Sequence, residues 1–254
     1  MEIQFPVTVD LFGHHLLIHP ILESIGIFIA MRYYAFLRKK HKSTLTTFQS
    51  LNIIIGAFVG ALLGSKIIGT LENPQAFFES KNQLLFFWTS NTIIGGLFFG
   101  LIGVELTKKI IGYKESTGDL IAFPLIIAII IGRIGCFLTG IYEQTYGLPT
   151  SSIFGMHLGD EYLRHPVALY EIFFLIILLI ILKIIKKKYN YPSGFIFQLF
   201  MFCYFSFRFL LDFIKPKVNV FFCLSTIQIT CLIIVIYYIY KLLNNCSLIY
   251  KKDK

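Results

Sequence analysis

Seven runs of mostly apolar residues run through this chain, each about as long as the ~20-residue helix that crosses the hydrocarbon core of a membrane. Lipid offers backbone amides no hydrogen-bonding partner, so a spanning segment must satisfy them internally, as a helix does. We therefore predict an all-α integral membrane protein in which residues 1–254 form a single polytopic domain of seven transmembrane helices. The expected spans are Pro20–Leu37, Leu51–Leu71, Leu84–Val104, Leu120–Ile141, Val167–Ile185, Gly194–Ile214 and Phe221–Leu243.

The composition excludes a soluble protein. Hydrophobic residues make up 56% of the chain and charged residues only 15%, whereas a soluble domain carries roughly 25% charged residues. A fold of this size could not bury so much isoleucine, leucine and phenylalanine, including 27 phenylalanines, in one soluble core. The five cysteines include no CxxC pair, so they indicate neither a zinc motif nor a disulfide framework.

Most of the lysine and arginine residues fall in loops on one side of the predicted membrane helices. Lysine and arginine in cytoplasmic loops orient membrane proteins, and here 15 of these residues fall after the first, third, fifth and seventh spans, against 4 in the remaining loops. We expect the N-terminus outside and the C-terminus in the cytoplasm. The net charge of +9 is then explained by orientation and by contact with anionic lipid, and a nucleic-acid partner is not required.

Two arginines inside predicted spans indicate an anion site. A charge at membrane depth costs ~2.5–3.5 kcal/mol unless it is paired or faces a wet cavity. Arg133 is flanked by Gly132, and Arg208 shares a helix face with Tyr204, with Lys215 seven residues further on. Because the arginine fork matches phosphate geometry, a phospholipid head group is the expected ligand.

A structural explanation of the same arginines stays open at this point. Glu171 and Asp212 also fall inside predicted spans and are possible ion-pair partners of the two guanidiniums. Glu23, Arg32 and Lys66 are further charged residues at membrane depth. Arg32 is close enough to the cytoplasmic end of its span for the side chain to extend into the interface.

Glycines recur every four residues in the second and third spans, at Gly56, Gly60 and Gly64 and at Gly96 and Gly100. This spacing allows helix backbones to approach closely, so it predicts helix packing. Gly95 and Gly96 lie near the outer part of the membrane, and we expect the missing side chains there to make room for a ligand as well.

Three sequence motifs resemble those of the prolipoprotein diacylglyceryl transferase family. Residues Gly132–Phe137 resemble its G-R-x-G-N-F signature, and Arg164–Glu171 resembles its R-H-P-[ST]-Q-L-Y-E motif. Residues Tyr204–Asp212 are similar to its Y-x-x-x-R-F-x-x-E motif. The three occur in the order found in the family, and the resemblance extends over nearly the whole chain.

The resemblance implies a reaction in the bacterial cytoplasmic (inner) membrane. A diacylglyceryl group would pass from phosphatidylglycerol to the cysteine thiol of a lipoprotein precursor, releasing glycerol phosphate. By the same resemblance, Arg133 would bind the lipid phosphate and Arg208 would stabilise the leaving group, with Tyr204 beside it. Lys215 stands where the family has a second arginine.

Several positions depart from the family pattern. The histidine of the His-Gly-Gly motif is replaced by Ile94, before Gly95 and Gly96, and isoleucine cannot accept a proton. The other departures are Cys136 and Thr139 in place of asparagines, Ile141 in place of a glutamate and Ala168 in place of a glutamine. Glu143 and His165 are the candidate substitute bases.

No metal ion or other cofactor is expected. His14, His15 and His19 have no carboxylate or cysteine at metal-ligand spacing in the sequence.

Two hypotheses on function remain. The first is an enzyme that transfers a diacylglyceryl group to a lipobox cysteine. The second is a non-catalytic or differently specific phospholipid-binding relative, an accessory or lipid-handling membrane protein, which Ile94 and Cys136 favour. A small-solute transporter fits less well, because the sequence has no internal repeat.

Overall fold

The computed structural model describes residues 4–11, 13–41, 45–218, 220, 223–246 and 250–251, and these residues are mostly helical. The helices among them are α1 (Ile18–Lys40), α2 (Thr47–Leu71), α3 (Pro74–Glu79), α4 (Gln83–Thr89), α5 (Ile93–Ile110), α6 (Gly118–Thr139), α7 (Val167–Lys188), α8 (Phe195–Leu211) and α9 (Thr226–Cys246). Two 3-10 turns, η1 (Gly140–Tyr142) and η2 (Asp212–Ile214), follow α6 and α8.

Short antiparallel strand pairs occur at the ends of the helices in the described residues. They are β1 (Thr8–Leu11) with β2 (His14–Leu17), β3 (Met156–His157) with β4 (Leu163–Arg164), and β5 (Tyr189–Asn190) with β6 (Tyr250–Lys251). The apolar periodicity did not predict these pairs, because each strand is too short to carry a pattern.

The predicted helical membrane architecture is confirmed. Within the described residues, six helices are long and apolar enough to cross a membrane, namely α1, α2, α6, α7, α8 and α9. Phe221, where the last predicted span begins, lies outside the described residues, and α9 begins only at Thr226. A capping box sets that start, because Ser225 and Gln228 each accept a hydrogen bond from the other's backbone N–H, both at 3.1 Å.

The prediction of one continuous helix over Leu84–Val104 is wrong. The chain bends by 83° between α4 and α5, so the part of this segment within the bundle begins at Ile93. The polar residues Ser90 to Thr92 make the break. The Ser90 hydroxyl donates to the Phe86 carbonyl at 2.7 Å, and the Thr92 N–H donates across to the Ser65 carbonyl of α2 at 3.2 Å. The Ser90 side chain thus caps the end of α4, and the Thr92 N–H has its acceptor in α2 instead of in its own helix.

Glycines bring α2 and α5 into close contact, as the four-residue spacing predicts. A Cβ at Gly60 would lie 2.3 Å from the Phe99 carbonyl oxygen, and one at Gly103 would lie 2.1 Å from the Gly56 carbonyl oxygen. Only glycine permits this backbone approach.

Gly95 and Gly96 occupy different surroundings although they are neighbours in the chain. A Cβ at Gly95 would lie 2.2 Å from the Gly64 carbonyl oxygen, so this glycine is required for helix packing. A Cβ at Gly96 would lie 3.6 Å from the Ala61 carbonyl oxygen, an ordinary contact.

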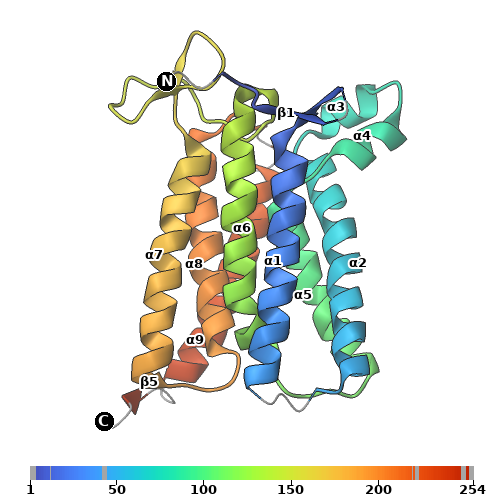
Figure 1. The fold of residues 1–254 in the computed structure, drawn as a ribbon, viewed down its shortest axis with the longest axis vertical. Helices are drawn as coiled ribbons and strands as arrows, with labels where there is room; N and C mark the ends of the chain where they lie inside the picture. The colour runs from blue at the N-terminus through green and yellow to red at the C-terminus, as the bar shows by residue number, and fades with distance from the viewer. Residues whose placement is uncertain are drawn as a thin grey trace.

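The helices form a bundle in which α1 lies along α6 and α8 lies along α9 (Figure 1). The core is built mainly by α6, α7, α8 and α9, where Ile126, Leu175, Phe200 and Ile227 are almost completely buried. Apolar side chains elsewhere on the helices stay exposed in the isolated chain, Phe58 and Phe173 among them. That distribution suits a bundle surrounded by lipid.

One end of the bundle carries β1 and β2, α3, α4 and residues 143–166, and we call it the hairpin end (Figure 1). Backbone hydrogen bonds hold it together. The Val7 N–H donates to the Leu138 carbonyl at 2.9 Å, and the Leu148 N–H donates to the Ile214 carbonyl at 2.8 Å. The segment after α6 and the segment before α1 are thereby fixed over the ends of α6 and α8.

The two neighbouring glycines provide a matched test of the packing. Gly95→Ala is expected to destabilise the folded protein by about 1–3 kcal/mol, because the added methyl overlaps the backbone of α2. Gly96→Ala is expected to change stability by less than about 0.5 kcal/mol. Thermal unfolding of both variants in the same detergent measures the difference, and equal melting temperatures would contradict the packing assigned to Gly95.

Candidate active site

Glu171 is the centre of a buried polar cluster formed by α6, α7 and α8. Its side chain is fully buried in the first turns of α7. The Arg133 Nε lies 2.9 Å from Oε1 of Glu171, and the Arg208 Nη1 donates to Oε2 at 3.0 Å. The Tyr204 hydroxyl donates to Oε1 at 2.7 Å. One carboxylate thus holds both arginines and the tyrosine that the sequence motifs indicated.

The cluster retains one positive charge, because it contains two guanidiniums and one carboxylate. The Arg208 Nε is buried and has no hydrogen-bonding partner among the described residues, whereas the Arg133 Nε already lies against the Glu171 carboxylate. Buried N–H groups without partners are rare in proteins. The arrangement therefore has both the charge and a free donor, the Arg208 Nε–H, to accept an anion.

The two acidic residues that the sequence left as possible ion-pair partners of the arginines, Glu171 and Asp212, have different contacts. Glu171 pairs with both arginines. Asp212 instead accepts a hydrogen bond from the Ser225 hydroxyl, and no described ion pair joins it to Arg208.

Lys215 lies just beyond η2 at the hairpin end, and only 8% of it is exposed. Burial lowers the pKa of its ammonium group to about 8, and the positive charges of Arg208 and Arg133 act in the same direction. The carboxylates of Glu72 and Asp212 oppose this shift. The pKa of Glu72 is itself raised by burial, while Lys215 and Arg208 lower it. Lys215 is thus electrostatically coupled to the arginine cluster.

A second cluster, not predicted from the sequence, lies beside the first. His19 Nδ1 lies 2.5 Å from Oε1 of Glu143, and His19 Nε2 lies 3.6 Å from the Cys136 Sγ. The Arg133 Nη1 donates to the same sulfur at 3.5 Å. Arg133 therefore joins the Glu171 cluster on one side to the His19 cluster on the other.

Close packing of α1 on α6 places His19 in this position. A Cβ at Gly135 would lie 2.6 Å from the His19 ring, and a Cβ at Gly26 would lie 3.1 Å from the Ala128 carbonyl oxygen. The Ile18 N–H donates to the Val7 carbonyl at 3.3 Å, which fixes the start of α1. Gly135 is the second glycine of the G-R-x-G motif, so it admits the imidazole next to Cys136.

The His19 cluster contains ligand types that bind zinc. One atom from each of His19, Cys136 and Glu143 lies within 4.8 Å of the others. However, the Arg133 guanidinium donates to the Cys136 sulfur, and its charge would repel a dication there. We do not assign these residues as metal ligands. Sequence spacing gave no sign of the cluster, because Cys136 and Glu143 lie 117 and 124 positions from His19.

The two candidate bases have different surroundings. Glu143 belongs to the His19 cluster, whereas the Nδ1 of His165 is hydrogen-bonded to the Tyr170 hydroxyl at 3.2 Å. No described contact joins His165 to the arginines. Ile94, at the position of the family histidine, is completely buried in the core.

Two departures from the family motifs lie together in the fold. Cys136 and Ala168 both line a small cavity below residues 143–166. A thiol and a methyl group thus replace a pair of amide side chains at one place.

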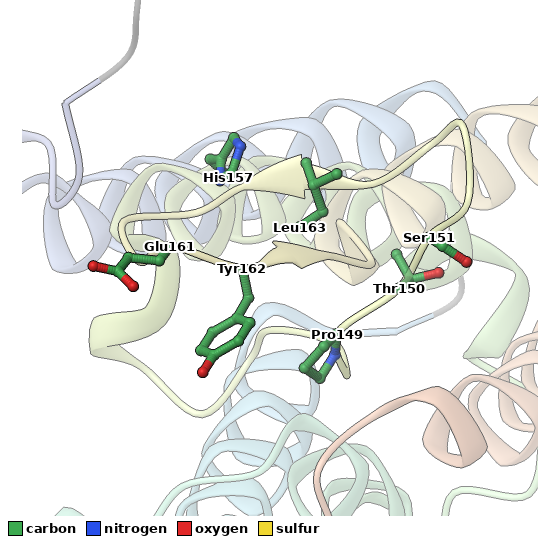
Figure 2. A pocket seen from close by; sticks show the side chains of 7 residues that line it. All are labelled: Pro149, Thr150, Ser151, His157, Glu161, Tyr162 and Leu163. Carbon is green, nitrogen blue, oxygen red and sulfur yellow. The ribbon is translucent and has the colours of Figure 1, made fainter.

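A separate, shallow pocket of about 600 Å³ lies in the loop between α6 and α7 (Figure 2). Figure 2 shows Glu161 at one end of it and Thr150 and Ser151 at the other. Arg164 supports this loop, since its Nε donates to Asp160 at 2.8 Å. None of the residues that line the pocket belongs to the Glu171 or His19 cluster.

Comparison with known proteins identifies the family. The chain matches the prolipoprotein diacylglyceryl transferase family over residues 6–243, and it belongs to that family.

The chain is similar to several proteins that carry the name phosphatidylglycerol–prolipoprotein diacylglyceryl transferase. The chain is 29% identical to the one from Photobacterium profundum over 220 residues, which is 83% of this chain and 80% of the relative. It is 32% identical to the one from Ehrlichia ruminantium over 208 residues, 77% and 78% of the two chains. It is 34% identical to the one from Aeromonas salmonicida over 175 residues, 65% and 60% of the two.

Removal of the central carboxylate tests the ion-pair cluster. Glu171→Gln is expected to destabilise the protein by about 3–5 kcal/mol, because two neighbouring guanidiniums are left buried without a counter-charge. Glu161→Gln, at an exposed position of the outer loop, is the matched control and should leave stability unchanged. Thermal unfolding in detergent is the measurement, and a stable Glu171→Gln variant would show that the arginines do not depend on this carboxylate.

Proposed function

We propose that this chain transfers a diacylglyceryl group from phosphatidylglycerol to the thiol of a lipobox cysteine in a lipoprotein precursor. It would do so as a multi-pass protein of the bacterial cytoplasmic (inner) membrane. The N-terminus would lie outside and the C-terminus in the cytoplasm, so the hairpin end would face the outer leaflet. The excess of lysine and arginine in the loops at the opposite end supports this orientation.

The observation that carries the proposal is the surplus positive charge of the Glu171 cluster. The phosphodiester of phosphatidylglycerol bears one negative charge, and Arg133, Arg208 and Glu171 together bear one positive charge. Binding of the phosphate would make the buried site electrically neutral. It would also supply an acceptor for the Arg208 Nε–H, which has no partner among the described residues.

Lys215 would stabilise the negative charge that develops on the phosphate during the reaction. Cleavage of the glycerol carbon–oxygen bond turns the phosphodiester into a phosphate monoester, which gains a second negative charge. The ammonium of Lys215 is coupled to both arginines and supplies a further cation for that charge. Tyr204 would hold the bridging carboxylate in place through its hydrogen bond to Glu171.

One observation favours a second candidate, a phospholipid-binding relative without transferase activity. Ile94 fills the position of the family histidine with a buried hydrocarbon side chain, so the proton acceptor of the family is missing there. This candidate predicts selective binding of phosphatidylglycerol without transfer, and it predicts that Ile94→His does not produce transfer.

The transfer reaction itself is the direct test. Purified protein should move a labelled diacylglyceryl group from phosphatidylglycerol to a lipobox peptide, and Arg208→Ala should reduce the rate by roughly 10²-fold or more. Arg32→Ala, an exposed arginine of α1, should retain the rate. Mass spectrometry of the peptide gives the readout. Transfer that survives both Arg133→Ala and Arg208→Ala would contradict the assigned phosphate site.

The pKa of Lys215 predicts a pH dependence of lipid binding. With a pKa of about 8, Lys215 is charged below that pH and neutral above it, so binding of phosphatidylglycerol should weaken as pH rises through about 8. Lys215→Arg should remove this loss, because arginine stays charged throughout. Lys217→Arg is the control and should behave as the wild type. Binding is measured by titration of lipid into the detergent-solubilised protein, and identical profiles for wild type and Lys215→Arg would exclude this role.

A further inference from the structure

We propose that His19 is the catalytic base that takes the proton from the acceptor thiol, and that Glu143 positions it. This inference rests on the proposed transferase function. It assigns a proton acceptor for the thiol, a role that Ile94, at the position of the family histidine, cannot fill. The inference is based on the contact between α1, α6 and the segment after η1, which lie together beside Arg133.

The two ring nitrogens of His19 have different partners. We assign to neutral His19 the tautomer with the proton on Nδ1, in which the Glu143 carboxylate accepts from Nδ1–H at 2.5 Å and Nε2 can accept a proton. The carboxylate also stabilises the imidazolium that forms on proton transfer, as the acid does in a carboxylate–histidine pair. Glu143 is therefore a positioning residue for His19.

Cys136 shows that a thiol fits at the reactive nitrogen. Its sulfur lies 3.6 Å from the His19 Nε2 and 3.5 Å from the Arg133 Nη1. A second thiol that reaches the Nε2 would be near the guanidinium that binds the lipid phosphate. The base and the phosphate site are thus adjacent, as attack on a carbon next to that phosphate requires.

The exposure of the residues also suits the role. The side chains of His19 and Glu143 are 19% and 28% exposed, so a peptide cysteine can approach and a proton can leave to solvent. Arg208 and Glu171 are almost completely buried. The His19 cluster is therefore the accessible side of the site, and the Glu171 cluster is the enclosed side.

The His19 Nε2 takes the proton of the acceptor S–H. The thiolate attacks the glycerol carbon bonded to the phosphate oxygen, so a carbon–sulfur bond forms and the carbon–oxygen bond breaks. The electron pair of that bond leaves on glycerol phosphate, and the proton on His19 passes to the phosphate or to water. No oxidant, reductant or metal is needed.

The test compares two histidines at the hairpin end in the labelled transfer assay. His19→Ala is expected to lower kcat by roughly 10²–10⁴-fold while binding of phosphatidylglycerol is retained, and added imidazole should restore part of the rate. His15→Ala is the matched control, because His15 is exposed and pairs only with Asp10 in the described contacts. If His19→Ala does not fold, His19→Gln keeps a polar side chain of similar reach and removes the base.

Variants of the neighbouring residues separate the possible roles. Glu143→Ala should lower kcat without changing KM for the lipid, and Glu143→Gln should recover part of it, because the amide oxygen still accepts from Nδ1–H. Labelled lipid found on Cys136 of the wild type would overturn the inference in favour of Cys136 as the nucleophile.

Two further results would also overturn it. An unchanged rate in His19→Ala would show that His19 is not the base. Stoichiometric zinc in the purified protein that disappears in His19→Ala would make the cluster a metal site. Wild-type protein without any transfer activity would instead contradict the proposed function, and the inference with it. Active wild type with an unaffected His19→Ala variant contradicts the inference alone.

Discussion

The Glu171 carboxylate, held between Arg133 and Arg208, is the interaction on which the rest of the site depends. A single buried acid fixes guanidiniums from α6 and α8 and the Tyr204 hydroxyl to the first turns of α7. Two arginines at this depth repel each other and lose their hydration. The carboxylate offsets one of the two charges and leaves the other for a ligand. Stability and anion binding are therefore set by the same three charged groups.

Arg133 connects two chemical functions. On one side it lies against Glu171, and on the other it donates to Cys136 next to His19 and Glu143. The enclosed side has the charge balance of a phosphate site, and the accessible side has the geometry of a proton acceptor. Such a division suits a reaction that joins a membrane lipid to a thiol arriving from outside the bilayer.

The sequence predicted most of the fold, because a membrane-spanning helix must be long and apolar. Six spans agree with the structure within a few residues at most ends. The break between α4 and α5 was missed, because three polar residues within an apolar run change its hydropathy little. Gly95 was expected to make room for a ligand, and the structure accounts for it by contact with α2.

The site was predictable only in part. Arg133 and Arg208 stood out because charge is costly at membrane depth, and Lys215 because it lies seven residues after Arg208. The role of Glu171 as a shared partner required the geometry of three helices. His19 could not be connected to Cys136 and Glu143 by spacing, because the contact depends on the close approach of α1 to Gly135. Long-range proximity of this kind is set by packing, which short motifs do not encode.

The central claim is that the phosphate of phosphatidylglycerol binds to the arginines around Glu171. The most direct measurement is an experimental structure of the protein with a non-reactive phosphatidylglycerol analogue bound. We expect its phosphate oxygens to lie within hydrogen-bonding distance of Arg133 and Arg208. The glycerol carbon that the thiol would attack should lie on the side that faces His19. A phosphate bound elsewhere, without contact to either arginine, would contradict this binding mode.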